Sequence, residues 1–444
     1  MITTPIFTRL LSLEQYGQTA NFYSWYDLLY PFVTMYLSGV AYNNVLVKYE
    51  DKRDEATFSL MTLASVVTFF FFVVYVLFSD FWNELFGINT FMMIFMFIYL
   101  LFVPIVDFWS AKERYDYKYK KLVALTFFNS FFSLFISVLL VMNIDYKYEA
   151  RVLPNIIITA LIGLIIYYSY FKKNSFKFTA KYWKYALIIS LPLIPHYLSI
   201  KILNQVDRVM ITKLVGLSET GLYSLAYTIA CLMIIFTDAI NRSLCPYIYK
   251  SIKNNNVDGV SKVINSVSVL VMAVSFLEML LAPELIRVFA TTEYLDAVFI
   301  IPPVAMSVFF IFLYVVYSNV EFYYEKTVFA TVVSVVAALC NIILNYIFIP
   351  IWGYYAAGFT TLLCYMLFAV LHYMNYKKIV QNHIELSDLY DNRFILIICI
   401  IGILLIPACL ILYEYNIIRY ILIGIICIVS IIKSKAIVKV LKIK

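Results

Sequence analysis

Four polar residues, Tyr197, Lys201, Asn204 and Arg208, recur at positions i, i+4, i+7 and i+11 of an otherwise apolar stretch. In an α-helix this spacing places all four side chains on one face. Ionisable residues inside a membrane-spanning segment are costly, so they mark functional positions by default. The pattern therefore predicts a cationic stripe that lines a cavity. In the alternative interpretation, Arg208 extends to the membrane surface and pairs with Asp207, and Lys201 reaches the surface in the same way.

Four other ionisable residues are candidates for ion coupling or gating. Asp27 has no cation within one helical turn, so it must pair with a cavity cation or bind a coupling proton. His196 can titrate near neutral pH, although a hydrogen-bonded structural histidine is the alternative. Asp238 and Arg242 stand at i and i+4 with the acid first, which favours an intrahelical ion pair.

These residues must be positioned by membrane helices. The chain has 444 residues, of which 63% are hydrophobic and only 14% charged, whereas a water-soluble domain is typically about a quarter charged. A helix that crosses a bilayer needs roughly 20 apolar residues. The composition predicts an all-α polytopic membrane protein, and it excludes a cytosolic enzyme, a secreted disulfide scaffold and a nucleic-acid-binding protein.

Apolar runs bounded by charged clusters predict thirteen complete spans. They lie near 19–42, 57–79, 91–110, 122–142, 154–171, 188–214, 220–242, 263–282, 298–320, 328–349, 354–376, 394–413 and 416–432. The apolar stretch 1–11 is too short to cross alone, so we interpret it as the outer half of a further helix. We therefore expect fourteen spans with the first incomplete. Pro192 and Pro195 predict a kink in the seventh.

Orientation follows from the 34 Lys and Arg residues, because positive loops stay on the cytoplasmic side. Most of them fall in one alternating set of segments: 43–56, 111–121, 172–184, 243–262, 321–327, 377–393 and 433–444. This asymmetry predicts that both termini are cytoplasmic.

The chain also carries an internal repeat. The residues Thr8, Arg9, Leu10, Leu13 and Gly17 recur with the same spacing as Thr212, Lys213, Leu214, Leu217 and Gly221. We expect two parallel six-helix lobes, 1–180 and 181–376, followed by two helices and a basic tail in 377–444, with the substrate site between the lobes. The repeat also predicts that one to two dozen residues of the first helix are missing upstream. The repeat mates Arg9 and Lys213 either contact the substrate or anchor the helices at the interface.

Other kinds of site are not indicated. The seven cysteines include no CxxC pair, so they are interpreted as small apolar residues and not as metal ligands or disulfides. The spacing of Gly216 and Gly221 imitates the start of a phosphate loop, but Leu222 and Tyr223 occupy the positions of its Lys and Ser/Thr. We expect no cofactor, no metal and no nucleotide-driven motor.

Several stretches carry a family resemblance. Leu203-Asn-Gln-Val-Asp-Arg-Val-Met-Ile211, Gly221-Leu-Tyr-Ser-Leu-Ala-Tyr227 and the preceding segment 182–199 resemble Wzx-type polysaccharide and O-antigen flippases of the multidrug/oligosaccharidyl-lipid/polysaccharide exporter superfamily. Asn341-Ile-Ile-Leu-Asn345 with Pro350-Ile-Trp-Gly353, the segment 282–294 and the N-terminal 4–17 are similar to the same family.

The resemblance implies translocation of an undecaprenyl-diphosphate-linked oligosaccharide across the bacterial inner membrane by alternating access, for surface polysaccharide biosynthesis. The expected substrate contacts are Tyr197, Lys201, Asn204, Arg208, Arg9 and Lys213. The expected coupling or gating residues are Asp27, Asp207, Asp238, Arg242 and His196. The implied partners are the lipid-linked substrate, membrane lipid, a coupling ion (H⁺ or Na⁺) and, as an open association, the polysaccharide polymerase machinery.

Two alternatives stay open at this point. A small-molecule drug exporter of the same superfamily would have the same architecture. A membrane glycan polymerase or ligase is the other alternative, but such enzymes need a sizeable outer loop, and the longest predicted outer loop covers only 283–297. We therefore expect a transporter and not an enzyme.

Overall fold

The computed structural model describes residues 3–174, 179–254, 259–383 and 389–432, and within these ranges it contains helices and no strands. The chain divides into two compact units. We call Ile6–Thr220 the N-terminal unit and the residues from Gly221 onward the C-terminal unit. Residues 181–220, which the sequence assigned to the second lobe, thus pack with the N-terminal helices, and the division at residue 180 stays a prediction.

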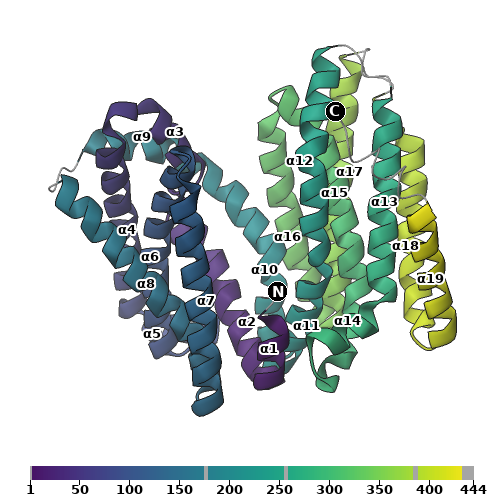
Figure 1. The fold of residues 1–444 in the computed structure, drawn as a ribbon, viewed down its shortest axis with the longest axis horizontal. Coiled ribbons are helices and arrows are strands. Elements are labelled where there is room, and N and C mark those ends of the chain that lie inside the picture. The colour runs from purple at the N-terminus through teal and green to yellow at the C-terminus, as the bar shows by residue number, and fades with distance from the viewer. Residues whose placement is uncertain (1–2, 175–178, 255–258, 384–388, 433–444) are drawn as a thin grey trace. The chain divides into compact units, whose positions relative to one another are not determined.

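The N-terminal unit is a bundle of long helices joined by short ones (Figure 1). Its elements are α1 (Thr4–Leu10), α2 (Leu13–Val33), α3 (Val40–Lys48), η1 (Glu50–Lys52), α4 (Arg53–Leu77), α5 (Ser79–Phe86), α6 (Thr90–Tyr115), α7 (Tyr119–Asn143), α8 (Lys147–Asn174), α9 (Ala180–Ser190), η2 (Leu191–Leu193) and α10 (Ile194–Leu214). Helix α8 packs against α6 and α7, and α10 packs along α2. A reciprocal cap between Ser12 and Gln15 fixes the start of α2.

The predicted span 19–42 is not one helix. Helix α2 ends at Val33, and α3 begins at Val40. Between them Met35 and Tyr36 adopt positive φ angles of 51° and 45°, a left-handed conformation that is uncommon for residues other than glycine. Hydrophobicity alone could not reveal this break, because the segment stays apolar through it.

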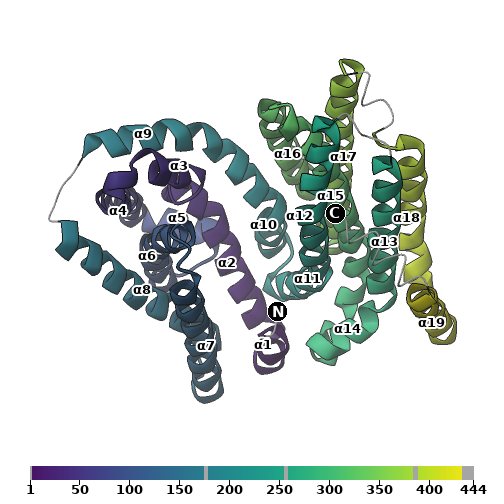
Figure 2. The same ribbon diagram turned by 45° about the horizontal axis from the view of Figure 1, so that its top comes forward.

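The predicted kink in the seventh helix is present. A 3₁₀ turn, η2, which contains Pro192, separates α9 from α10, and Pro195 follows in the first turn of α10. Figure 2 shows the resulting bend between α9 and α10. Because α9 packs on α3 and α4 while α10 follows α2, the bend lets one predicted span contact two parts of the unit.

The C-terminal unit continues from α11 (Leu217–Ala230), which begins before the boundary. Its elements are α12 (Leu232–Lys253), α13 (Val260–Leu280), α14 (Ala282–Phe289), η3 (Thr292–Ile300), α15 (Ile301–Tyr323), α16 (Thr327–Trp352), α17 (Tyr355–Gln381), α18 (Asn392–Leu412) and α19 (Asn416–Ile432). Helix α15 is the central element, since it packs against α17, α12, α13 and α18. Most of its residues are buried.

Eleven helices in the described residues are long and apolar enough to cross a membrane. They correspond one by one to the predicted spans from 57–79 to 394–413. Outside these eleven, the segment 19–42 forms parts of α2 and α3, 416–432 yields the shorter apolar helix Asn416–Val429, and 1–11 yields α1, so the total of fourteen spans stays a prediction. The parallel repeat stays a prediction, whereas the all-helical multi-pass architecture is confirmed.

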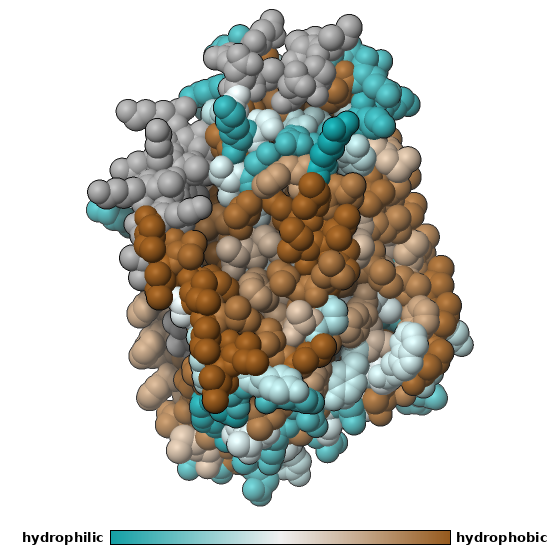
Figure 3. Space-filling model, turned by 90° about the vertical axis from the view of Figure 1, so that its right-hand side faces the viewer, coloured by the Kyte–Doolittle hydropathy of each residue, from teal (hydrophilic) through white to brown (hydrophobic). Residues whose placement is uncertain are grey.

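One face of the C-terminal unit shows how the chain suits a bilayer. Figure 3 shows hydrophobic side chains across the middle of this face and hydrophilic ones at both ends. Exposed apolar residues of α18 and α19 include Leu396, Ile400, Leu404, Ile421 and Ile428. In water such a surface would be unfavourable, so it is suited to contact with lipid.

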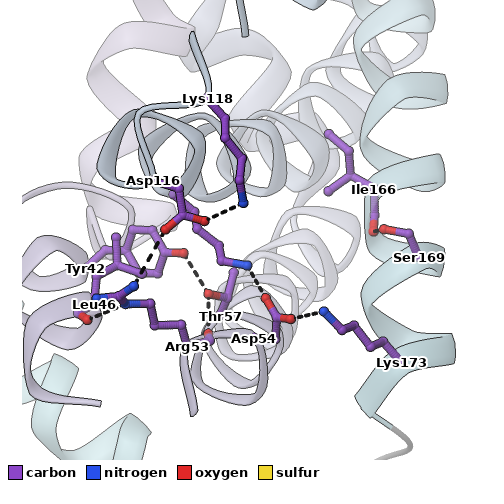
Figure 4. A network of polar contacts seen from close by, with 11 residues as sticks. Tyr42, Leu46, Arg53, Asp54, Thr57, Asp116, Lys118, Ile166, Ser169 and Lys173 are labelled. Carbon is purple, nitrogen blue, oxygen red and sulfur yellow. Dashed lines mark hydrogen bonds and ion pairs between the residues drawn. The ribbon is translucent and has the colours of Figure 1, made fainter. Parts of the chain in front are cut away.

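Three predicted basic segments meet at one end of the N-terminal unit (Figure 4). Asp54 forms ion pairs with Lys112 of α6 and Lys173 of α8. Asp116 pairs with Arg53 at 3.6 Å and with Lys118 at 3.0 Å. The segments 43–56, 111–121 and 172–184 therefore lie on the same side, as the alternating charge pattern requires; that this side is cytoplasmic stays a prediction.

Candidate functional site

The N-terminal unit contains a cavity of about 400 Å³, formed by α2, the turn after it, α3, α6 and α10. Its walls carry three tyrosines, two carboxylates and two cations. These residues are Tyr26, Tyr30, Tyr36, Asp27, Asp107, Arg114 and Lys201. All of them belong to the N-terminal unit.

Lys201 is positioned by the packing of α10 along α2. Its Nζ lies 2.5 Å from Oδ1 of Asp27. Gln205, one turn further along α10, donates from Nε2 to Oδ2 of the same carboxylate at 2.9 Å. The two α10 side chains thus occupy both oxygens of Asp27, and the Lys201 ammonium is neutralised where it borders the cavity.

Arg208 joins this arrangement through the same glutamine. Its Nη1 donates to Oε1 of Gln205 at 3.0 Å and to the backbone oxygen of Asn204 at 2.7 Å. Ser24 of α2 donates to Oε1 of Gln205 as well, at 3.2 Å. Arg208 is only 8% exposed, so its guanidinium is not extended into solvent. We call Asp27, Lys201, Gln205 and Arg208 the polar chain.

Tyrosine rings form the other wall. The rings of Tyr36 and Tyr197 lie 4.2 Å apart, which places the first predicted contact residue of α10 against the turn after α2. Tyr30 donates its hydroxyl proton to Oδ2 of Asp107 at 2.5 Å, and its oxygen also lies 3.1 Å from the Ser38 hydroxyl. The wall therefore offers both aromatic faces and hydroxyl groups.

Sequence reasoning missed several of these residues. Asp107 lies in the predicted span 91–110, so the rule that singled out Asp27 also applies to it. Gln205 stands one helical turn after Lys201, and its amide suits it to link charged neighbours. No sequence signal marks Tyr36, because its place depends on the break between α2 and α3.

Other predicted site residues lie elsewhere. Arg9 and Lys213 are exposed and do not line the cavity. Asn204 donates to the backbone oxygen of Ile200 at 2.7 Å within its own helix. His196 is partly buried, with its ring 5.5 Å from that of Tyr197. Asp207 is completely buried.

The predicted intrahelical pair in the C-terminal unit is not formed. Asp238 and Arg242 both lie exposed on α12, and among the described residues no ion pair joins them. Their i, i+4 spacing permits a pair on an isolated helix, but at exposed positions such a pair stabilises by only a few tenths of a kcal/mol.

Metal chemistry is not suggested by the described part of the chain, where no group of three or more His, Cys, Asp or Glu residues is placed to hold a metal ion. The cysteines are free. The residues that line the cavity can form ion pairs and hydrogen bonds and can offer aromatic rings to a ligand.

Two proteins of Haemophilus influenzae are similar to parts of the chain. Protein 1 of the Lsg locus is 26% identical over 208 residues, which cover 43% of this chain and 49% of that protein. A membrane protein of uncharacterised function is 32% identical over 114 residues, covering 24% of this chain and 28% of that protein. The chain thus matches half or less of the length of these relatives.

Two solved structures share the fold. The lipid II flippase MurJ in an inward closed conformation has a TM-score of 0.66 at 14% identity, covering 98% of this chain and 96% of the other. An inward-facing multidrug resistance MATE transporter of the MOP superfamily has a TM-score of 0.64 at 12% identity, covering 87% and 95%. Residues 6–299 match the profile of a family described as polysaccharide biosynthesis protein. Because the match covers more than half of the residues, this chain is a member of the polysaccharide biosynthesis protein family.

Proposed function

We propose that the protein translocates an undecaprenyl-diphosphate-linked oligosaccharide across the bacterial inner membrane for surface polysaccharide biosynthesis. The family membership and the fold shared with MurJ support a lipid-linked saccharide as the transported class. A sugar–diphosphate head group cannot cross hydrocarbon unaided, because each unpaired polar group costs several kcal/mol and a charge costs more. The protein has to supply a polar route for the head group while the polyprenyl tail stays in lipid.

The polar chain is the observation that carries the proposal. Lys201 and Arg208 are the cations it offers, and Lys201 borders a cavity of about 400 Å³. A diphosphate oxygen can replace Asp27 as the partner of Lys201, because both are anionic oxygen acceptors. Tyr26, Tyr30 and Tyr36 then offer ring faces and hydroxyls to the sugar.

The proposed cycle is alternating access of two lobes, with both termini in the cytoplasm. The chain would use an ion gradient or exchange, and H⁺ or Na⁺ is the coupling ion we consider. Replacement of Asp27 by substrate at Lys201 links binding to a change in an interaction between α2 and α10. Such a differential interaction is what a ligand needs in order to shift a conformational equilibrium.

The test is a deletion strain of the source bacterium examined for lipid-linked oligosaccharide and for surface polysaccharide. We expect the lipid-linked glycan to accumulate on the cytoplasmic leaflet and surface glycan to be lost. Complementation with the wild type should restore export, whereas Lys201→Ala should fail at a normal protein level. Lys213→Ala is the matched control, since Lys213 is exposed and outside the cavity. Normal surface glycan in the deletion strain would refute the proposal.

A small-molecule exporter is the second candidate. Asp27 and Asp107 give the same cavity two carboxylates, which suit organic cations, and the fold is shared with a MATE transporter. Increased sensitivity of the deletion strain to cationic drugs, with unchanged surface glycan, would favour this candidate over the flippase.

A further inference from the structure

The C-terminal unit holds a second buried ionisable pair. Oε2 of Glu321 on α15 lies 2.9 Å from Nδ1 of His372 on α17. The side chains are 0% and 2% exposed, respectively. Helices α15 and α17 run side by side in Figure 1 and pack closely. An ionisable pair so far from solvent is expensive unless its charges are balanced.

Aromatic side chains enclose the histidine. The Tyr314 ring stacks on His372 with centroids 5.5 Å apart, and the Phe368 ring meets it edge-on at 4.8 Å. The Phe329 ring of α16 lies 6.4 Å away. These neighbours make the surroundings poor in polar groups, which strengthens any electrostatic effect at the pair.

The surroundings determine how many protons the pair holds. Without a proton the pair carries one negative charge; with one proton it is neutral; with two it carries one positive charge. A medium of low polarity favours the neutral state. In addition, Oε1 of Glu321 and Nε2 of His372 have no hydrogen-bond partner among the described residues. A second proton would give this buried pair a net positive charge, so a single proton fits these surroundings best.

The other titratable and charged groups near the pair lie on the same or neighbouring helices. The pair has no further side-chain ion pair or hydrogen bond within the described part of the chain. On α12, Asp238 acts electrostatically on Tyr314, whose ring stacks on His372. The remaining titratable or charged residues of the neighbouring helices, apart from their tyrosines, are Arg242, Cys245, Lys250 and Lys253 on α12, Lys262 and Glu278 on α13, Cys340 on α16, Cys364, Lys377 and Lys378 on α17, Arg393, Cys399 and Cys409 on α18, and Glu293 and Asp296 on η3.

We propose that Glu321 and His372 form a proton-binding site, and that its single proton is the ion exchanged during the transport cycle. The proton is held on Nδ1 of His372 or on Oε2 of Glu321; its release leaves Glu321 ionised and His372 neutral. The coupling to transport rests on the function proposed above. A metal cation does not fit, because the site offers one imidazole and one carboxylate and no third ligand among the described residues.

Release requires a path for the proton. In the packed state both residues are shielded, so exchange needs water to reach the contact between α15 and α17. A site that is closed in one conformation and hydrated in another binds and releases its proton at different stages of a cycle. This is the differential interaction that couples an ion to a conformational change.

The chain is well suited to a direct test, because it has only three histidines. The full-length protein, labelled with ¹⁵N-histidine and placed in lipid nanodiscs, is titrated by NMR from about pH 5 to about pH 9. We expect the His372 signal, assigned with His372→Gln, to change reversibly in one step. Glu321→Gln should change the midpoint of that step, because it removes the carboxylate that shares the proton.

Two results would refute the proposed proton-binding site at Glu321 and His372. A wild-type His372 signal that stays constant over the whole range means that the pair is a fixed structural contact. A step that is identical in Glu321→Gln means that the carboxylate does not share the proton. Because the wild-type titration alone can refute the site, the proposal remains testable if the Glu321 variant folds poorly.

An assay of surface glycan export tests the coupling to transport separately from the existence of the proton-binding site. Glu321→Gln and His372→Gln should each reduce surface glycan export roughly tenfold at normal protein levels. Glu325→Gln and His383→Gln are matched controls near the same helix ends, and Glu325 is exposed. Wild-type export by both pair variants would refute the coupling. If deletion of the whole gene leaves export intact, the proposed function fails, while the NMR titration still decides whether the proton site exists.

Discussion

Lys201 on α10 and Asp27 on α2 form an ion pair with 2.5 Å between Nζ and Oδ1, and their side chains are 34% and 27% exposed, respectively. The charge of the Lys201 ammonium is therefore balanced by Asp27, while the pair stays partly accessible to solvent. An exposed pair of this kind contributes only about 1 kcal/mol or less, so an incoming anion can compete with the carboxylate. Under the proposed function, Asp27 and the anionic substrate would compete for Lys201.

Removing this competitor should strengthen anion binding. With undecaprenyl diphosphate as the probe in nanodiscs, we expect Asp27→Asn to bind about three- to fivefold more tightly, because the pair no longer has to be broken. Lys201→Ala should bind about tenfold or more weakly, because a charge-assisted hydrogen bond is lost. Calorimetric or fluorescence titration measures both changes.

Lys213→Ala serves as the control for this experiment and should bind as the wild type does. Equal affinity of Asp27→Asn and the wild type would show that the carboxylate does not compete for Lys201.

The sequence predicted the helices well because each depends on a local property. Runs of apolar residues identified eleven spans correctly, and the prolines at 192 and 195 marked the bend in the seventh. The predicted span 19–42 failed because the left-handed residues Met35 and Tyr36 end α2 without any polar or glycine signal at their positions. Tertiary contacts, and not local preference, determine the conformation there.

The site was predicted only in part, for a similar reason. Helical spacing identified Lys201 and Arg208 on α10, but their partners depend on which helix packs beside α10. The roles of Gln205 and Asp107 depend on how α2, α6 and α10 pack together, which the sequence does not show. The Glu321–His372 pair joins residues 51 positions apart in the chain, a contact that no periodic pattern reveals.

The position of Tyr36 depends on Gly39. A Cβ added at Gly39 would lie 2.5 Å from Cε1 of the Tyr36 ring, so the ring would have to leave its place beside Tyr197. We expect Gly39→Ala to lower the stability by about 1–3 kcal/mol, as overpacking does, and to reduce glycan export. Thermal unfolding in detergent and surface-glycan assays measure the two effects.

A double variant separates this contact from a general defect. If Tyr36 is the residue displaced, Gly39→Ala combined with Tyr36→Ala should behave as Tyr36→Ala alone. Gly424→Ala is the control, because no atom lies within 4 Å of its added Cβ. Additive losses in the double variant would contradict the proposed displacement.

Gln205 should couple the two cations of α10. Its amide binds Asp27 through Nε2 and Arg208 through Oε1, so a change at either end is transmitted through one side chain. In a double-mutant cycle of Lys201→Ala and Arg208→Ala, we expect an interaction energy above about 0.5 kcal/mol in binding of undecaprenyl diphosphate. In the Gln205→Leu background the two effects should become additive.

Additive effects already in the wild-type background would show that the polar chain does not act as a unit. Asn204→Leu is the matched control for Gln205→Leu, since the Asn204 amide donates to its own helix at Ile200. This control should leave the interaction energy unchanged.

Arg419 should stabilise the C-terminal unit and not act in transport. Its side chain is only 2% exposed, and it bonds Glu284 of α14 through two nitrogens, at 2.9 and 2.7 Å, while Nη1 also donates to the backbone oxygen of Leu280 at 3.1 Å. Arg419→Gln removes these charge-assisted bonds and leaves the Glu284 carboxylate without its cation.

We expect Arg419→Gln to lose about 1.5–3 kcal/mol in unfolding free energy, since hydrogen bonds to charged groups contribute about this much. Thermal or denaturant unfolding in detergent measures this loss. Arg287→Gln is the control, because Arg287 lies on α14 with Glu284 and is exposed. The protein that remains folded in the Arg419 variant should bind undecaprenyl diphosphate with wild-type affinity, because the cavity belongs to the N-terminal unit; weakened binding at equal folded fraction would contradict a purely stabilising role.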